Sequence, residues 1–375
     1  MDCASLRDEF PITQDSIFFN NAAVSPLPLR TERTVCDLAR RRALAASADF
    51  PQWMQEVEEA RRLCARLTGA AVASEIAFTA NTSHSLSFAA AGLGLGPGDA
   101  VAVTRPDFPS VVYPWLGLRD QGVEVRFIER QHGRFSVDDA QRILDDSVRL
   151  LCVSSVDWVS GFMADLPALG ALCRERGVLF CVDAIQSLGA IPLDVEVMRI
   201  DLLAAGSHKW LLSPMGVGVL YVSQRVRERV QPRVLGWRSV ENAEDFGLDF
   251  QIKNDARAFE AGTLNLAGIL GLKTSLDMML GLGLPAIQQR VHGLGGQIIR
   301  GLKERSIKVA TPENAAERAG IVSFDPPSNT IMLHRYLADQ GVVCSLRQGL
   351  IRLAPHFYND SSDVEKFFKI LDEML

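Results

Sequence analysis

Short apolar runs typical of buried strands alternate with segments of helical spacing through the first two thirds of the chain. The candidate strands are residues 76–79, 100–103, 123–127, 150–153 and 178–182. Between them, helical spacing occurs in residues 83–93, 137–146 and 166–176. This alternation predicts an α/β fold in which helices cover both faces of a mostly parallel sheet. Functional side chains are then expected at the carboxyl ends of the strands.

The final third of the chain has a different pattern. A helical stretch covers residues 266–304, with a break near residues 281–285. Short strand-like segments follow, and a last helix is expected at the end: residues 320–324, 342–345, 350–353 and 363–375. We therefore predict a large domain of residues 16–265 and a smaller α+β domain of residues 266–375 that packs with residues 1–15.

Composition excludes several classes of function. The 39 Lys and Arg and the 45 Asp and Glu are spread along the 375 residues, so no basic stripe indicates binding to nucleic acid or to a membrane surface. The N-terminus is charged and has no apolar signal core. The apolar stretch 263–284 contains Lys273 and Asp277, which favours a buried helix over a membrane span. Seven cysteines without paired spacing or a nearby His cluster predict reduced thiols, a cytoplasmic protein and no metal site.

One lysine lies between two apolar, strand-like runs. Lys209 follows residues 200–206, precedes residues 216–222, and stands 26 positions (209 − 183) after Asp183. Desolvation penalises a charged ammonium there, and proteins accept that cost where the amine must act as a nucleophile in Schiff-base chemistry with pyridoxal phosphate. An aspartate at the end of the preceding strand is the usual partner of that cofactor's pyridine nitrogen. A structural lysine is the alternative interpretation.

The segment that carries this spacing resembles a known family. Its motifs are Val182-Asp183-Ala184-Ile185-Gln186 and Ser207-His208-Lys209-Trp210, and it is similar to the class V aminotransferase family of fold-type I pyridoxal-phosphate enzymes. Cysteine desulfurases, kynureninases, isopenicillin N epimerases and cysteine or cystine C–S lyases belong to that family. The resemblance implies that Lys209 holds the cofactor as a Schiff base and then removes the Cα proton of a small α-amino acid. It also implies that Asp183 keeps the pyridine nitrogen protonated and that the chain forms a homodimer.

The resemblance assigns further contacts with the cofactor. Asn81, Thr82 and Ser83 stand where a strand turns into a helix, and the amide groups of a helix N-terminus favour a phosphate. The same three residues also make an ordinary helix cap. Phe108 is expected to stack on the pyridine ring without acting as an acid or base. The other expected contacts are Gln186 with the phenolic oxygen, and Ser207 and His208 with the phosphate.

Two later segments resemble parts that the family places at a dimer interface. Thr263 is expected to reach the cofactor phosphate of the partner subunit. Trp237 is expected to enter the partner's site, with an exposed loop aromatic as the alternative.

Arg352 is expected to bind the substrate α-carboxylate, because its planar guanidinium matches two oxygens. Asn21 and Ala22 belong to an N-terminal loop that is expected to face the substrate.

The chain lacks the loop with which cysteine desulfurases accept sulfur. In those enzymes the loop and its cysteine directly precede the arginine segment, whereas here Arg347-Gln348-Gly349 leads straight into Ile351-Arg352. Cys344 lies in an apolar run and is interpreted as a buried core thiol. A lyase or epimerase-like reaction is therefore predicted, with a true aminotransferase as the alternative and an inactive binding or regulatory homologue as the remote one. No role is assigned to Trp158 or His356.

Overall fold

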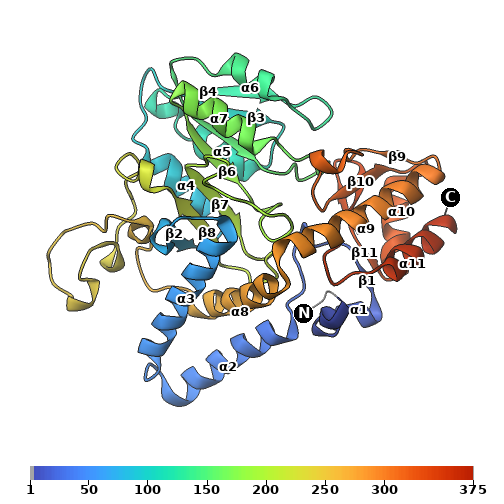
Figure 1. Ribbon diagram of the computed structural model, residues 1–375, viewed down its shortest axis with the longest axis horizontal. Helices are drawn as coiled ribbons and strands as arrows, with labels where there is room; N and C mark the ends of the chain where they lie inside the picture. The colour runs from blue at the N-terminus through green and yellow to red at the C-terminus, as the bar shows by residue number, and fades with distance from the viewer. Residues whose placement is uncertain (1–3, 375) are drawn as a thin grey trace.

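The computed structural model describes residues 4–374, and a seven-stranded sheet forms its centre (Figure 1). All neighbouring strands are parallel except β8, which is antiparallel to both β2 and β7. The predicted α/β fold with a mostly parallel sheet is therefore confirmed. In sheet order the strands are β2 (Ile76–Thr79), β8 (Gly218–Val222), β7 (Leu202–Gly206), β6 (Leu179–Asp183), β5 (Val148–Ser154), β3 (Ala100–Arg105) and β4 (Glu124–Glu129).

Helices cover both faces of this sheet. Successive strand residues alternate between the two cores: Val101 and Val103 of β3 pack on one side, and Ala100 and Ala102 pack on the other. Because both faces are buried, these strands are almost continuously apolar. The first face is covered by α4 (Thr82–Gly92) and α5 (Pro109–Leu116), and the second by α3 (Phe50–Thr68), α6 (Val137–Ile143), α7 (Leu166–Arg176) and α8 (Leu266–Leu282).

A second, antiparallel sheet lies in the C-terminal third. Its order is β12 (Ser345–Arg347), β13 (Leu350–Leu353), β10 (Val322–Asp325) and β9 (Lys308–Val309). It packs with α9 (Leu284–Glu304), α10 (Thr330–Asp339) and α11 (Ser361–Asp372). The start of the chain contacts this region: β1 (Ile17–Phe18) pairs in parallel with β11 (Val342–Val343), and Arg7 forms an ion pair with Asp363 at 2.8 Å.

Some elements differ from the predictions. No element is predicted for residues 29–68, where α2 (Leu29–Ala45) and α3 lie. The helix predicted to reach residue 146 ends at Ile143, because Asp145 Oδ1 accepts hydrogen bonds from the Ser147 N–H (3.0 Å) and hydroxyl (2.6 Å) and so forms a turn. The last helix begins two residues before its predicted start and ends at Asp372; residue 375, like residues 1–3, lies outside the described residues.

The domain boundary stays a prediction. α8 contributes Ile269, Leu270, Leu272 and Leu276 to the core of the large sheet, whereas α9 packs mainly with the C-terminal sheet. We therefore propose that the boundary lies at the break near Gly283 rather than after residue 265. The remaining helix is α1 (Ile12–Asp15), and the 3-10 turns are Ala4–Glu9, Ala73–Glu75, Arg119–Gln121, Gln224–Val226, Trp237–Ser239, Ala243–Asp245, Ala256–Phe259 and Ala315–Glu317.

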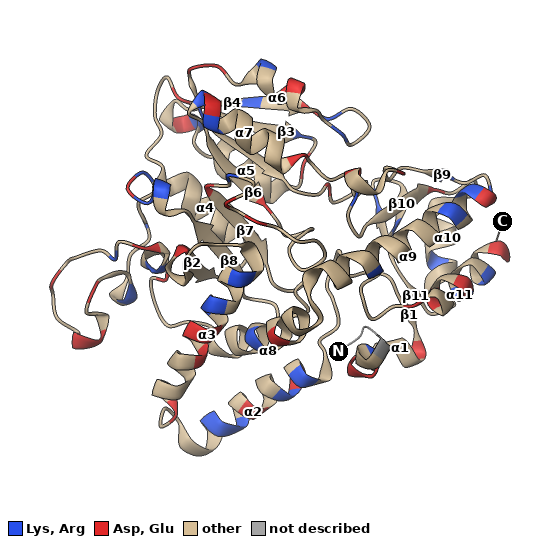
Figure 2. Cartoon of the chain, in the orientation of Figure 1, with Lys and Arg blue, Asp and Glu red and all other residues tan. Residues whose placement is uncertain are grey.

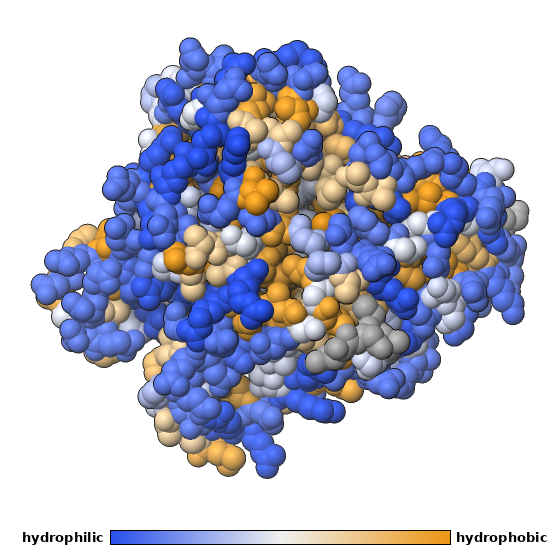
Figure 3. Space-filling view, viewed as in Figure 1, coloured by the Kyte–Doolittle hydropathy of each residue, from blue (hydrophilic) through white to orange (hydrophobic). Residues whose placement is uncertain are grey.

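The surface combines charges of both signs. Lys and Arg are interspersed with Asp and Glu over the helices and loops (Figure 2). On the face shown in Figure 3, hydrophilic residues cover most of the surface, and hydrophobic residues gather in the middle. By length and composition, no single helix of residues 4–374 could cross a membrane; α8 and α9 pass that test only as a pair, bent by 82°. Within the same residues, no three His, Cys, Asp or Glu side chains are grouped to hold a metal ion.

Candidate active site

Three side chains that can act in catalysis or bind a ligand follow the carboxyl ends of three parallel strands. Asp183 ends β6, Lys209 lies three residues beyond β7, and Phe108 lies three residues beyond β3. Because parallel strands end at one edge of a sheet, these residues converge. Lys209 Nζ lies 5.8 Å from the centroid of the Phe108 ring, and the charges of Lys209 and Asp183 shift each other's pKa. The site therefore lies at the edge of the sheet where the topology predicts it.

Lys209 is a largely buried amine. Burial lowers the pKa of its ammonium to about 8; the carboxylate of Asp183 opposes this shift, and Arg352 and Arg347 add to it. An exposed lysine has a pKa of about 10.4, so a much larger fraction of Lys209 is neutral at neutral pH. A neutral amine can attack an aldehyde or accept a proton.

One carboxylate oxygen of Asp183 accepts a hydrogen bond and the other does not. Oδ1 accepts a hydrogen bond from the Ile185 N–H at 2.9 Å, while Oδ2 accepts none from the described residues. The side chain is 2 % exposed, and burial raises its pKa, against the effects of the Ile185 N–H and of Lys209. A protonated ring nitrogen would satisfy Oδ2 and stabilise the ionised carboxylate, so Asp183 and Lys209 together fit pyridoxal phosphate.

The first turn of α4 is suited to a phosphate. Asn81 is the N-cap, and its side-chain oxygen accepts a hydrogen bond from the His84 N–H at 2.9 Å. The N–H groups of Thr82 and Ser83 stand in the first turn, where the helix supplies no carbonyl acceptor for them. The Ser83 hydroxyl shares a 2.6 Å hydrogen bond with Ser110, and the Thr82 hydroxyl accepts from the Gly206 N–H at 2.8 Å. Free donors and the helix dipole favour an anion here.

Three further residues that are predicted to contact the cofactor differ in how their polar groups are already used inside the protein. The Ser207 hydroxyl bonds the carbonyls of Pro214 and Val217, both at 2.9 Å, so its one proton is used inside the protein. The Gln186 amide donates to Ala22 O at 3.1 Å and keeps a second N–H. His208 has a pKa lowered by burial and then by the Lys209 charge, so it is a neutral imidazole near pH 7.

Phe108 and Trp158 form an aromatic pair beside Lys209. Their rings meet edge to face, with centroids 5.5 Å apart. Phe108 is 39 % exposed, so one face of its ring is available for stacking on a ligand. This pair places Trp158, to which the sequence assigns no role, against Phe108.

A buried arginine ties together the loops that carry the two rings. Arg130 forms ion pairs with Asp107 at 2.6 Å and with Asp157, the residues that precede Phe108 and Trp158. Asp107 also accepts from the Phe108 N–H at 2.7 Å. The sequence pattern assigns no role to Arg130, although this residue directly follows β4 and so stands at the edge of the sheet where functional residues are expected.

Arg352 is a buried cation that forms no ion pair with an Asp or Glu of residues 4–374. It is 2 % exposed, its Nη1 donates to Trp158 O at 2.7 Å, and its Nε has no hydrogen-bond partner. Burial lowers its pKa to about 10, and the charge of Arg347 adds to the shift. An unpaired buried charge is costly, so this guanidinium fits an incoming carboxylate.

The N-terminal loop lies next to these residues, but most of its polar groups are satisfied. The Asn21 amide donates to Ala354 O and accepts from Ser25 and Tyr358, each at 2.8 Å. His356 is also internal: its Nε2 bonds Trp210 O at 3.1 Å and its Nδ1 accepts from the Phe357 N–H. Asn21 and His356 therefore brace the loops around the site, and Ala22 contacts Gln186 through its carbonyl.

Trp237 and Thr263 lie apart from Lys209 in the same chain. Among the described residues, no hydrogen bond or ring contact joins either to Lys209 or Asp183. Thr263 lines a separate cavity of about 270 Å³ together with Ala80 and His84. Trp237 contacts Phe246, which is 76 % exposed on the loop of residues 233–251 that projects from the body of the protein (Figure 1).

The segment before Arg352 is a tight hairpin. β12 and β13 are joined by Gln348 and Gly349 alone, both with positive φ (47° and 80°), the geometry of a two-residue turn. Cys344 is 8 % exposed and burial raises its pKa to about 12. The predicted absence of an inserted loop and the predicted burial of Cys344 are both confirmed. All six cysteines in the described part of the chain are free thiols.

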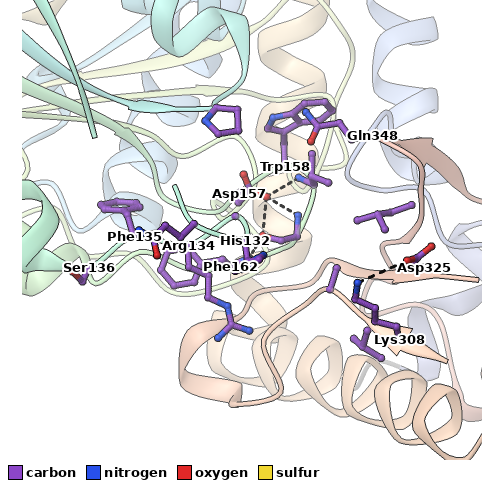
Figure 4. A pocket seen from close by; sticks show the side chains of 18 of the residues that line it. His132, Arg134, Phe135, Ser136, Asp157, Trp158, Phe162, Lys308, Asp325 and Gln348 are labelled. Atoms are coloured by element: carbon purple, nitrogen blue, oxygen red, sulfur yellow. Dashed lines mark hydrogen bonds and ion pairs between the residues drawn. The ribbon is translucent and has the colours of Figure 1, made fainter. Parts of the chain in front are cut away.

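A cavity of about 890 Å³ opens beside this hairpin. In Figure 4, Trp158 and Gln348 lie above the Lys308–Asp325 ion pair, and Phe135 lies on the side of the cavity away from that pair. Its walls come from the loops after β3, β4 and β5 on one side and from β9, β10 and the β12–β13 hairpin on the other.

A lysine with a lowered pKa, an aspartate with a free carboxylate oxygen, an exposed aromatic ring and a helix start suited to an anion are the groups that a pyridoxal-phosphate enzyme of fold-type I needs. The sequence model of the family "Aminotransferase class-V" matches residues 17–367, and the chain belongs to this family.

Curated relatives and solved structures agree with this assignment. The chain is 30 % identical to a probable cysteine desulfurase of Pyrococcus abyssi, over 99 % of this chain and 97 % of that protein. It is 28 % identical to an uncharacterized aminotransferase of Bacillus subtilis, over 96 % and 94 %. The apo structure of the cysteine desulfurase from Thermococcus onnurineus NA1 has a TM-score of 0.90, with 27 % identity over 99 % of this chain and 97 % of the other.

Proposed function

We propose that this protein removes the Cα proton of a small α-amino acid and follows a lyase or epimerase-like course. The observation that carries the proposal is that the charges of Asp183 and Arg352 both act on Lys209. These three groups supply a base, a counter-charge for a protonated ring nitrogen and a site for an α-carboxylate.

The residues of the chain then have separate tasks. Bound pyridoxal phosphate supplies an electron sink for the negative charge that develops at Cα. Arg352 binds the α-carboxylate and orients the Cα–H bond. Lys209 Nζ, whose pKa of about 8 leaves a larger neutral fraction than in an exposed lysine, takes the proton from Cα and can return it. Phe108 and Trp158 exclude water from one side, and Asp183 holds a proton on the ring nitrogen.

The hairpin supports a course without a protein persulfide. Its two-residue turn carries no cysteine, and Cys344 is a buried thiol with a pKa of about 12, so it has almost no thiolate at neutral pH. Transamination is the second candidate, because one relative bears the name of an aminotransferase.

The projecting loop supports a homodimer with shared sites. Leu248 is 100 % exposed and Phe246 and Phe250 are 76 % and 69 % exposed on the loop of residues 233–251. Clustered exposed apolar side chains mark a protein contact. We propose that this loop, with Trp237, and the exposed Thr263 complete the site of a partner subunit. A cytoplasmic location also stays a prediction.

The test uses the purified protein with bound cofactor and a panel of amino acids. Keto acid, released sulfide and the inverted isomer are measured in parallel, together with exchange of the Cα proton in D2O. We expect Cα exchange to depend on Lys209, and an elimination or inversion product without any persulfide on the protein. Borohydride reduction followed by mass spectrometry should place the cofactor on Lys209; a label on another lysine, or no label, contradicts the proposal.

A further inference from the structure

Two arginines lie on one face of the β12–β13 hairpin. Arg352 pairs with Ser345, and Arg347, two residues beyond Ser345, pairs with Leu350. Alternate residues of a strand point to the same side, and paired residues share a face. Arg347 and Arg352 therefore face the same side. The charge of Arg347 lowers the pKa of both Lys209 and Arg352, as expected if all three groups face the site.

Neither arginine is neutralised by the protein. Arg347 Nη1 donates to Leu346 O at 2.9 Å, and Arg352 Nη1 donates to Trp158 O at 2.7 Å. Across residues 4–374, no Asp or Glu forms an ion pair with either. Asp157 acts on Arg352 from a distance, but its carboxylate is already engaged by Arg130 and the Ser160 N–H.

Two other buried arginines have carboxylate partners, whereas Arg318, 5 % exposed, forms no ion pair within residues 4–374. Arg61 pairs with Glu260 at 2.6 Å, and Arg130 pairs with Asp107 at 2.6 Å. Like charges on one face repel each other, and an unpaired cation away from water is costly. The pair of Arg347 and Arg352 is therefore a site for two negative charges that come from outside the chain.

An α-carboxylate bound to Arg352 supplies only one of these charges. On the basis of the function proposed above, we infer that Arg347 binds a second anionic group, so that the substrate is an α-amino acid with a carboxylate or sulfinate on its side chain. Space for that side chain lies next to Arg347, where Gln348 and Trp158 line the cavity of about 890 Å³ (Figure 4). Arg347 is then a specificity residue, while Arg352 serves every amino acid.

The first test measures binding to the apoprotein, free of turnover. Titration calorimetry compares succinate, which has two carboxylates, with butyrate, which has one. We expect wild-type protein to bind succinate roughly ten- to a hundredfold more tightly, the effect of one charge-assisted contact. Arg347→Met should remove that preference, and Arg352→Met should weaken both ligands. Arg300→Met, an exposed position on α9, is the matched control and should retain the preference.

The second test measures kcat and KM with the cofactor bound. Aspartate and glutamate are compared with asparagine and glutamine. For wild type we expect the acidic amino acids to have the lower KM. In Arg347→Met that advantage should disappear, because the KM of the acidic amino acids rises to that of the neutral ones. Arg347→Gln is a second variant in case the methionine protein does not fold, and Arg347→Lys should restore part of the preference because it keeps the charge.

Several outcomes would overturn the inference. Equal binding of succinate and butyrate by wild type, or an unchanged preference in Arg347→Met, would show that Arg347 does not hold a second anion. The same holds if an acidic group of a second copy neutralises Arg347, since succinate preference would then be absent in the dimer. If neutral amino acids are the better substrates but Lys209 still carries the cofactor, only this inference fails. If no amino acid exchanges its Cα proton and Lys209 carries no label, the proposed function fails.

Discussion

The depressed pKa of Lys209 makes the capture of pyridoxal phosphate by the apoprotein depend on pH. The amine must be neutral to attack the aldehyde, so the rate of capture should rise with pH with a midpoint near 8, the pKa of the buried ammonium. Arg352→Met removes a positive charge that lowers this pKa, so the midpoint should move up. Asp183→Asn removes a negative charge that raises it, so the midpoint should move down.

Stopped-flow absorbance at a series of pH values measures both shifts. Arg300→Met, whose charge is not among those that act on Lys209, is the control and should leave the midpoint in place. Shifts of the two variants in the same direction would contradict the assignment, because loss of structure alone does not move a midpoint in opposite directions.

At the scale of the elements, Arg130 connects the loop after β3 with the loop after β5. Its guanidinium is 1 % exposed, and its removal leaves Asp107 and Asp157 buried without a counter-charge. We expect Arg130→Met to lower the free energy of unfolding by roughly 3–5 kcal/mol, measured by urea denaturation. Arg62→Met, which breaks an exposed pair with Glu59, should cost about 1 kcal/mol or less. Equal costs for the two variants would mean that the network does not hold the loops.

The β12–β13 hairpin carries a prediction about sulfur chemistry. Cys344→Ala should retain turnover within about twofold, because the thiol is buried and protonated and no cysteine stands in the turn. Cys36→Ala, at an exposed cysteine, is the control. A persulfide trapped on Cys344, with a large loss of activity in the variant, would show instead that the protein acts as a cysteine desulfurase.

The sequence predicts some elements better than others for physical reasons. Strands of the large sheet are buried on both faces, so their apolar runs identify them, and Asp183 and Lys209 follow from those runs. α2 is missed because only Thr31 and Leu38 of its 17 residues are buried, which leaves it almost no apolar face. Arg130 and Arg347 are missed because an arginine after or within a strand has no pattern of its own. Only the register of β12 with β13 shows that Arg347 shares a face with Arg352. Only the partners of each guanidinium show that Arg130 is paired with a carboxylate and that Arg347 is not.

The whole molecule is predicted to work as a dimer in which Thr263 serves the partner's cofactor. A phosphate dianion needs several donors, and the Ser207 hydroxyl is already engaged inside the chain. Loss of one charge-assisted bond should cost on the order of 1.5–3 kcal/mol, so Thr263→Ala should weaken retention of pyridoxal phosphate by roughly ten- to a hundredfold. Equilibrium dialysis against the cofactor measures this change, and Thr274→Ala on α8 is a control at a threonine whose hydroxyl bonds Thr34.

Mixed dimers decide which subunit Thr263 serves. Thr263→Ala subunits are combined with Lys209→Ala subunits, each weak or inactive alone. If Thr263 acts across the interface, one site of the mixed dimer contains Lys209 from one chain and an intact Thr263 from the other, and it regains near-normal affinity for the cofactor; the other site has both defects. If Thr263 acts within its own chain, every site keeps one defect and none recovers.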